Sequence, residues 1–546
     1  MSFARPGFTR SGACTACPFV FALSLLMLLL LFQRSLPFPF APDSASYFEQ
    51  ARNLVRTGAA VETGYGFDHL GLERSRLFPI GYPVILAGFG YFFGIDPKTA
   101  SLFLTALSAT LLPVLVFAAF RRALGDYRAL AVSFLTALSP SALSYSTVGT
   151  PDMLALALAV SSIALLLNKP SRAGFFLAGL LAGTAYAVRN AHLALVTALA
   201  LYMVYLWWRD PPARRQTFAA SSCLFAGILV IALPLIVRNL LFFGSPNPYN
   251  MAASTIPLVT NVRTYFQEAV YDLTAVREIA TFAGWSQAGA FASLIVVIAV
   301  GGYLKAQWAG LPDLRKRVVV MTLSYAAIGA ATVIAARTRF EWGETINIRH
   351  TLQYTPFVWA GLVALFPDTR THSVPAIALV VAFLFVAGAH VSYAWQPREL
   401  SLRDQRSRSA EEAYDAGKSF MCREYDNTIA GSNWGYVFTV ACGTATRNIE
   451  LAHYACAADA RGCDPVVRSA EYVAKRFPQK AIRLAFFPGR GIADSGHPLT
   501  EIGLKSLEDL RYTVQSNRRG ILLLTKQPSV TIEAPDVGKQ FVNNKL

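Results

Sequence analysis

One carboxylate stands out in this sequence because of where it falls. Asp43 lies about ten residues beyond the first apolar run, Val20 to Phe32, and a long polar stretch follows it. This spacing predicts that Asp43 stands at the water edge of a membrane. A free carboxylate is costly there, so such a residue is by default a candidate for chemistry or transport. We therefore treat Asp43 as the centre of a candidate site.

The composition of the chain indicates a membrane protein. Its 546 residues are 54% hydrophobic and 15% charged, with a mean hydropathy of +0.40, which is too apolar for a soluble protein of this size. Lys and Arg that hold loops in the cytoplasm and meet anionic lipid explain the net charge of +16. Nucleic acid is not expected as a partner. No small-residue cleavage site follows the first apolar run, so we expect it to remain as a helix.

Apolar runs of roughly 20 residues predict a polytopic α-helical fold. About twelve runs are candidates, but the run from Pro79 to Phe93 is short and rich in Gly and Pro, which predicts a re-entrant or interfacial element. About eleven transmembrane helices then remain, in a membrane domain of residues 1–395. Clusters of Lys and Arg place the N-terminus in the cytoplasm and the first long loop, residues 33–98, outside.

The region 396–546 has a different character and predicts a small soluble α/β domain. Charged residues become frequent, and helical patterns alternate with strand-like runs such as 482–487 and 521–525. An odd number of spans makes this domain extracytoplasmic. In an oxidising compartment its cysteines could form one or two disulfides, with three connectivities for two bridges, and free buried thiols are the alternative. These cysteines are Cys422, Cys442, Cys456 and Cys463.

Arginines also occur in the segments predicted to lie outside, against the charge bias that orients membrane proteins. An anionic partner would explain them, and so would headgroup contact or pairing with loop carboxylates such as Glu341 and Glu344. The outside arginines are Arg52, Arg56, Arg74, Arg76, Arg189, Arg238, Arg263, Arg277, Arg337, Arg339 and Arg349.

Two segments of the first loop carry a resemblance to a known family. Residues 42–54 have the apolar spacing of one helix face, which predicts a helix lying flat at the interface. Residues 76–83, Arg-Leu-Phe-Pro-Ile-Gly-Tyr-Pro, lead into the short apolar run. Together they resemble the first extracytoplasmic loop of the GT-C glycosyltransferases. The closest branch is the polyprenyl-phosphate-sugar-dependent one, which includes the protein O-mannosyltransferases and the lipid A aminoarabinose transferase.

Further positions fit the resemblance, which covers roughly residues 18–395. Asp152, in Gly-Thr-Pro-Asp, opens the fourth span, where the family places a second acid. Arg189 stands at the outer end of the fifth span. Arg349 and His350 precede an apolar helix, like the Arg-Tyr element of the family, with His350 in place of the tyrosine.

The resemblance implies inverting transfer of a sugar from a polyprenyl-phosphate donor to an acceptor hydroxyl. Such transfer needs a base for the hydroxyl proton and positive charge for the departing phosphate. We assign Asp43 as the general base, and Asp152 to support it or to orient the acceptor. The expected donor-phosphate ligands are Arg189, Arg349, Arg76, Arg337 and Arg339, and the expected substrate contacts are Tyr47, Tyr82 and His350.

Each assignment has a structural alternative. Asp43 could be the N-cap of the interface helix, Asp152 could be stabilised by its helix dipole, and His350 could be a packed or capping residue. Mg²⁺ or Mn²⁺ could be held between Asp43 and Asp152, but two acids are a thin ligand set, so no obligatory metal or other cofactor is expected.

The expected location is a bacterial inner membrane, and the acceptor could be a lipid, a polysaccharide or a protein. The alternative function is a secondary transporter or flippase of an anionic, lipid-linked or small substrate. Transporters usually show broken helices in two related halves, and the halves of this sequence look unrelated.

Overall fold

The computed structural model describes residues 14–63, 72–76, 78–168, 171–246, 248, 253–285, 308–340, 345–366, 374–396, 402–422, 428–442, 448–451, 464–487, 501–518 and 521–527. The chain divides into two compact units, Met1–Glu62 with Arg74–Asp404 and Thr63–Glu73 with Gln405–Leu546. Each unit has its own cluster of buried apolar side chains. The division into domains 1–395 and 396–546 stays a prediction.

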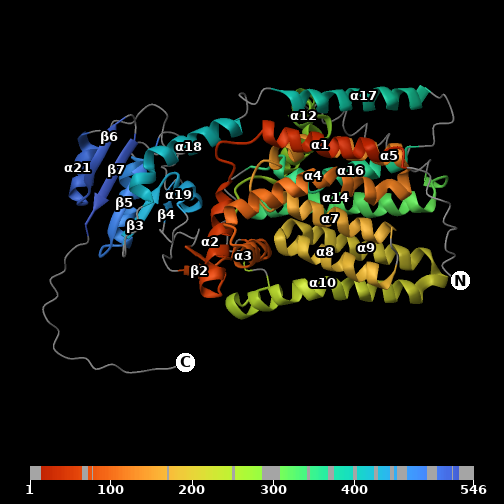
Figure 1. Cartoon of the computed structure of the whole chain (residues 1–546), viewed down its shortest axis with the longest axis horizontal. Helices are drawn as coiled ribbons and strands as arrows, with labels where there is room; N and C mark the ends of the chain where they lie inside the picture. Colours follow the sequence, from red (N-terminus) through yellow and green to blue (C-terminus); the bar gives the residue numbers. More distant parts are fainter. Residues whose placement is uncertain are drawn as a thin grey trace. The chain divides into compact units, whose positions relative to one another are not determined.

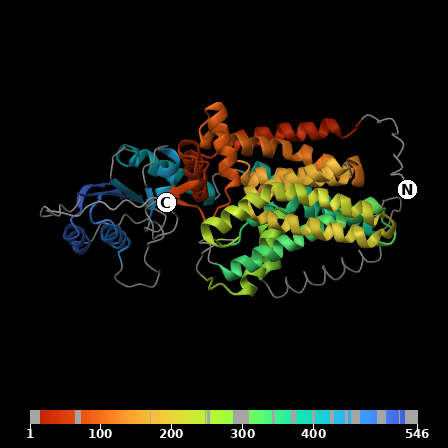
Figure 2. The same ribbon diagram turned by 90° about the horizontal axis from the view of Figure 1, so that it is seen from below.

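The first unit is a bundle whose long helices run side by side in both ribbon views (Figures 1 and 2). Within the described ranges, four helical stretches are long and apolar enough to cross a membrane. They contain α4 (Pro97–Leu124), η1 (Asn190–His192) with α9 (Leu193–Arg209), η2 (Pro211–Ala213) with α10 (Arg214–Phe243), and α14 (Asp313–Arg339). The chain therefore has a mostly helical membrane fold. The number of eleven spans stays a prediction.

Shorter apolar helices complete the bundle. They are α1 (Cys17–Gln33), α3 (Gly81–Phe93), α7 (Asp152–Asn168), α8 (Arg172–Val188), α16 (Thr355–Leu365) and α17 (Val374–Trp395). The remaining helices of this unit are α2 (Pro42–Thr57), α5 (Asp126–Ala137), α6 (Pro140–Tyr145), α11 (Leu258–Thr274), α12 (Arg277–Trp285) and α15 (Arg349–Leu352). The run predicted to be re-entrant thus forms helix α3, and whether it enters the membrane stays a prediction.

Small residues allow two helices of the bundle to approach each other closely. A Cβ added at Gly179 of α8 would lie 2.0 Å from the carbonyl oxygen of Leu224, and one at Gly227 of α10 would lie 2.2 Å from that of Phe176. Membrane helices approach this closely where glycine removes the side chain. The contact fixes α8 against α10, and Arg189 follows directly after α8.

The predicted helix after the first span is confirmed as α2. It starts at Pro42 and ends before Gly58, which has a positive φ of 72°, as is common at helix ends. The residue that caps it is Ala41, whose backbone N–H donates to Ser44 Oγ at 3.2 Å. The reading of Asp43 as the N-cap is therefore wrong. Asp43 lies one position inside the helix, where the dipole still stabilises a carboxylate, because the Ser44 hydroxyl supplies the cap hydrogen bond.

The second unit, described by itself, combines helices with a five-stranded sheet of order β4-β3-β5-β7-β6. β3 pairs in parallel with β4 and β5, whereas β7 is antiparallel to β5 and β6. The strands are β3 (Thr428–Ser432), β4 (Asn448–Glu450), β5 (Ala481–Phe486), β6 (Thr513–Arg518) and β7 (Ile521–Lys526). The helices are α18 (Leu402–Met421), α19 (Gly435–Ala441), α20 (Pro465–Arg476) and α21 (Glu501–Asp509). A separate two-stranded sheet joins β1 (Val61–Thr63) and β2 (Leu72–Arg74).

Two disulfides are present in the part of the chain that the structure describes. One joins Cys422 to Cys442, as in one of the three predicted connectivities. Its companion pair, Cys456 and Cys463, lies outside the described residues. The other disulfide joins Cys14 to Cys17. The extracytoplasmic position of residues 396–546 stays a prediction.

Candidate active site

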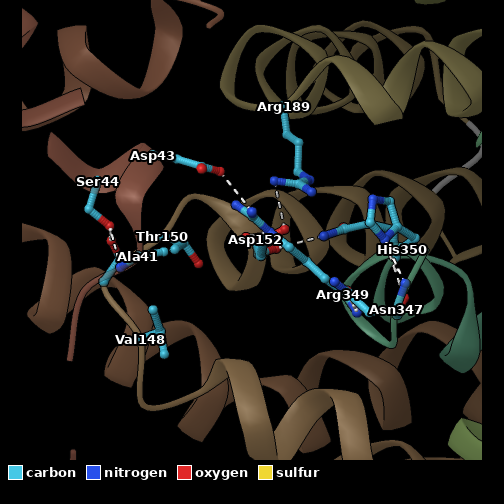
Figure 3. Close-up of polar contacts among 12 residues, drawn as sticks. Ala41, Asp43, Ser44, Val148, Thr150, Asp152, Arg189, Asn347, Arg349 and His350 are labelled. Atoms are coloured by element: carbon cyan, nitrogen blue, oxygen red, sulfur yellow. Dashed lines mark hydrogen bonds and ion pairs between the residues drawn. The ribbon is translucent and has the colours of Figure 1, made fainter. Parts of the chain in front are cut away.

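Four charged side chains that lie far apart in the sequence meet in the first unit (Figure 3). Arg349 bridges both predicted acids, with Nη1 at 2.7 Å from Asp43 Oδ2 and Nε at 3.1 Å from Asp152 Oδ2. Arg189 Nη1 lies 2.8 Å from the other oxygen of Asp152. The structure therefore joins the two predicted acids and two of the predicted arginines in one ion-pair network.

Each of these side chains comes from the end of a helix. Asp43 lies in the first turn of α2, and Asp152 is the first residue of α7. Arg189 follows the last residue of α8 with extended backbone angles. Acids at helix N-termini and bases at C-termini are stabilised by the helix dipole. Arg349 begins the short helix α15, where the helix dipole disfavours a positive charge. Its ion pairs with the two aspartates compensate for this.

A tight backbone contact holds the two acids near each other. Ser44 Oγ donates to the carbonyl oxygen of Gly149 at 2.8 Å, and the Gly149 N–H donates to the carbonyl oxygen of Pro39 at 2.9 Å. These bonds tie the turn before Asp152 to the start of the helix that carries Asp43. A Cβ at position 149 would lie 2.8 Å from Ser101 Oγ and 3.0 Å from the Phe40 ring. A larger residue would therefore force these neighbours to move, which favours glycine at this close approach.

Two residues that the sequence did not single out hold Arg349 in place. The Asn347 side chain accepts a hydrogen bond from the Arg349 N–H at 2.9 Å, which starts α15. Two residues on, Thr351 Oγ1 donates to Asp272 Oδ2 at 3.0 Å. An Asn two residues before a helix turn is a common local signal, so Asn347 could have been found from the sequence. Asp272 could not, because it lies 79 residues before Thr351, with α14 between them.

Asp272 is a buried carboxylate that joins three segments. It lies on α11 and accepts hydrogen bonds from Ser141 N at 2.8 Å and Ser141 Oγ at 2.7 Å, at the start of α6. It also accepts from Thr351, and through a short contact from Thr355 at the start of α16. Burial raises the pKa of Asp272, and the hydrogen bonds oppose this rise. Asp272 thus positions both α6, which leads to Asp152, and α15.

A chain of buried polar groups reaches the backbone of Asp152 from the bundle interior. Tyr325 OH lies 2.7 Å from His192 Nδ1, and His192 Nε2 lies 2.7 Å from Gln353 Oε1. Gln353 Nε2 then donates to the carbonyl oxygen of Asp152 at 3.2 Å. These residues come from α14, from η1 and from the segment between α15 and α16, so no local sequence pattern could have linked them.

The two predicted tyrosines pack against each other, and Tyr47 lies near enough to Asp43 to feel its charge. Tyr47 packs edge-on against Tyr82, with ring centroids 5.4 Å apart, and against Phe78 at 5.1 Å. Tyr82 OH pairs with Ser101 Oγ at 2.7 Å, and both tyrosines are buried. Burial and the Asp43 carboxylate raise the pKa of Tyr47, so its phenol keeps its proton. Their contact with substrate stays a prediction.

The other predicted residues are placed differently. His350 is buried and its Nδ1 lies 3.2 Å from the backbone N–H of Asn347, and the buried Arg337 lies within electrostatic reach of it. Arg339 stands over the Phe340 ring, and Arg76 over a phenylalanine of α10. Among the described residues, neither of these last two forms an ion pair with Asp43 or Asp152. Their role as donor-phosphate ligands stays a prediction.

The acids of the network are already satisfied by guanidinium groups. Asp152 is fully buried between Arg189 and Arg349, and Asp43, whose side chain is 27% exposed, is paired with Arg349. A divalent ion would therefore have to displace an arginine. In the described part of the chain no group of three or more His, Cys, Asp or Glu side chains is placed to hold a metal. The absence of an obligatory metal stays a prediction.

Comparison with known proteins places this arrangement in a class. Residues 78–242 match the sequence model of a family described as dolichyl-phosphate-mannose-protein mannosyltransferase. No curated protein matches this chain significantly. The matched segment contains Asp152 and Arg189 together with helices α3 to α10.

Solved structures share the fold at low sequence identity. ArnT from Cupriavidus metallidurans bound to undecaprenyl phosphate aligns with a TM-score of 0.55 at 12% identity, over 94% of this chain and 98% of that chain. The apo form of ArnT gives a TM-score of 0.54 at the same identity and coverage. The family match and the shared fold confirm the prediction of a membrane glycosyltransferase with the GT-C fold.

Proposed function

We propose that this glycosyltransferase moves a sugar from a polyprenyl-phosphate donor to a hydroxyl group of an extracytoplasmic acceptor, with inversion at the sugar carbon. The observation that supports this most directly is the bridging position of Arg349 between Asp43 and Asp152. ArnT, which shares the fold, was crystallised with undecaprenyl phosphate, a lipid of the same chemical class as the product that such a donor leaves behind.

The ion-pair network suits a ligand that carries a phosphate. Guanidinium groups bind phosphate oxygens through paired donors, and charge-assisted hydrogen bonds of this kind are strong. Arg189 Nε is buried and has no hydrogen-bond partner among the described residues, so a donor remains for a ligand oxygen. Arg349 Nη1 faces Asp43, the most exposed member of the network. A donor phosphate would meet Arg349 at this side.

Binding of the donor phosphate by Arg349 also prepares Asp43 for catalysis. When Arg349 turns from the Asp43 carboxylate to the donor phosphate, the Asp43 oxygen that was paired with Arg349 is freed to accept a hydrogen bond from the acceptor hydroxyl. Asp43 then takes the proton of the acceptor hydroxyl as its oxygen attacks the sugar carbon. The bond from that carbon to the phosphate oxygen breaks, and the polyprenyl phosphate leaves with one more negative charge, held by Arg189 and Arg349. A single displacement of this kind inverts the sugar carbon.

Asp152 has a supporting role in this proposal. It is fully buried and forms ion pairs with both arginines, so it fixes the spacing of the two guanidinium groups before the donor binds. Such preorganised charge contributes to catalysis because it needs no rearrangement when the leaving group develops its charge.

The proposal includes an inner membrane location with the N-terminus in the cytoplasm, eleven spans and an outward-facing C-terminal domain.

The direct test separates donor binding from transfer. Asp43→Asn should abolish glycan transfer because the amide cannot accept the proton. It should not lower the affinity for undecaprenyl phosphate, because Arg349 then has no Asp43 carboxylate to leave. Arg349→Met should weaken that affinity strongly. Asp96→Asn is a matched control, since Asp96 is an exposed first-loop acid that pairs with Arg52 at 3.3 Å. If the protein is instead a transporter, the native chain transfers no glycan and the Asp43 variant loses lipid movement. That result would reject the proposal.

A further inference from the structure

Three arginines gather around two adjacent aromatic rings at the Gly244 end of α10. The guanidinium carbon of Arg74 lies 3.4 Å from the ring centroid of Phe242. Those of Arg76 and Arg238 lie 5.3 and 5.2 Å from the centroid of Phe243. The rings hold the guanidinium planes by cation–π contact, so the three positive charges are kept close together. We call this group the Arg74 cluster.

In the part of the chain that the structure describes, no carboxylate forms a direct ion pair with Arg74, Arg76 or Arg238. Arg238 donates only to neutral acceptors, Asn239 Oδ1 at 2.8 Å and the Ser75 carbonyl oxygen at 3.3 Å. Glu62 is the acid that acts on Arg238 electrostatically, but burial raises the pKa of Glu62 to about 7. The positive charges of the three arginines repel one another. We therefore expect a bound anion to complete the cluster.

The position of the cluster along α10 fits a lipid headgroup. No charged residue lies between Arg215 and Arg238 in this helix. At 1.5 Å per residue these two positions are about 35 Å apart, close to the roughly 30 Å of hydrocarbon in a bilayer. If Arg215 meets one headgroup layer, Arg238 therefore meets the other.

An exposed apolar stripe runs along α10 up to the level of the cluster. Val230, Leu233, Val237 and Leu241 are 55%, 51%, 43% and 75% exposed, and their spacing of three and four residues puts them on one face of the helix. This face includes Val237, the residue before Arg238, and so offers acyl chains an apolar surface beside the cluster.

We propose that the Arg74 cluster binds the phosphodiester of an anionic bilayer phospholipid, whose acyl chains lie along the stripe on α10. Two exposed guanidinium groups, Arg74 and Arg76, reach the phosphate oxygens, and the half-buried Arg238 adds charge behind them. This role replaces the donor-phosphate role that the sequence suggested for Arg76, and it does not depend on the sugar, the acceptor or the base of the transfer reaction.

The test compares lipid preference in a matched pair of variants. The full chain in detergent micelles is titrated with dioleoylphosphatidylglycerol and dioleoylphosphatidylcholine, and bound lipid is counted by native mass spectrometry. Arg74→Gln with Arg76→Gln should lower the preference for phosphatidylglycerol at least tenfold. Arg56→Gln with Arg263→Gln removes the same charge from two other exposed arginines and should change the preference by less than twofold.

Three outcomes would overturn the proposal. One is an equal loss in both double variants, which indicates a general charge effect. Another is displacement of phosphatidylglycerol from the native chain by millimolar inorganic phosphate, which indicates a site for free phosphate. The third is displacement by undecaprenyl phosphate at a lower concentration than by added phosphatidylglycerol, which would assign the Arg74 cluster to the donor instead.

Discussion

The network predicts that its two aspartates differ sharply in what they do for stability. Asp152 is fully buried between Arg189 and Arg349, whose side chains are only 17% and 7% exposed. Removing one member of a buried ion pair leaves a buried charge and typically costs about 3–5 kcal/mol. We expect Asp152→Asn to lie near the lower end, about 3 kcal/mol, because Arg349 keeps Asp43 and the amide oxygen can still accept one hydrogen bond.

Asp43→Asn should behave differently because Asp43 is 27% exposed and, among the described residues, has only Arg349 as an ionic partner. Partly solvated pairs contribute about 1 kcal/mol or less. Thermal unfolding in detergent, followed by intrinsic fluorescence, should therefore show a fall of several degrees for Asp152→Asn and a small shift for Asp43→Asn. Asp96→Asn serves as the control acid.

A double variant makes this reasoning sharper. Asp152→Asn combined with Arg189→Met removes the acid together with one of the charges that it neutralises, so it should recover much of the lost stability. The argument would be refuted by an Asp43 variant as unstable as the Asp152 variant. It would equally be refuted if the double variant lost as much stability as the sum of the losses of the two single variants.

Three further predictions follow from other residues of the first unit. Burial raises the pKa of Glu62 from 4.5 to about 7, so its contribution is fully present below pH 4.5 and is lost as the pH rises through 7. Thermal stability of the native chain should fall from pH 5 to pH 8, by at most about 3 kcal/mol, and Glu62→Gln should remove this slope. Asp272→Ala leaves several buried donors unsatisfied and should cost about 3 kcal/mol and most of the turnover, whereas Asp272→Asn should be milder. A temperature midpoint unchanged by Asp272→Ala would contradict that role. Gly149→Ala, blocked by the Phe40 ring, should cost about 1–3 kcal/mol and lower turnover, and Gly88→Ala, with nothing within 4 Å, is the control that should do neither.

The four members of the ion-pair network could be picked out from the sequence because each stands at a recognisable boundary, but their pairing with one another could not. Asp43 and Asp152 stand at the starts of helices, and Arg189 and Arg349 stand beside apolar runs. The resemblance to a known family then suggested that they meet. Position alone could not have shown that one guanidinium, Arg349, binds both acids.

The supporting residues were missed for a physical reason. Asp272 lies on an amphipathic helix where an acid usually faces water, and only the fold shows that three hydroxyl groups and a backbone N–H converge on it. His192 and Gln353 meet across distant segments in the same way. The alternative in which Asp43 caps α2 is wrong because Ala41 occupies the cap position and the Ser44 hydroxyl, one residue after Asp43, supplies the cap hydrogen bond.

The proposed transfer is tested most directly by the masses of envelope glycolipids and glycoproteins in a strain that lacks this protein. We predict that one species loses the mass of a sugar, which identifies both sugar and acceptor. Expression of the native chain or of Asp96→Asn should restore that mass, whereas Asp43→Asn should not, although this variant still binds undecaprenyl phosphate. Full restoration by Asp43→Asn would contradict the account.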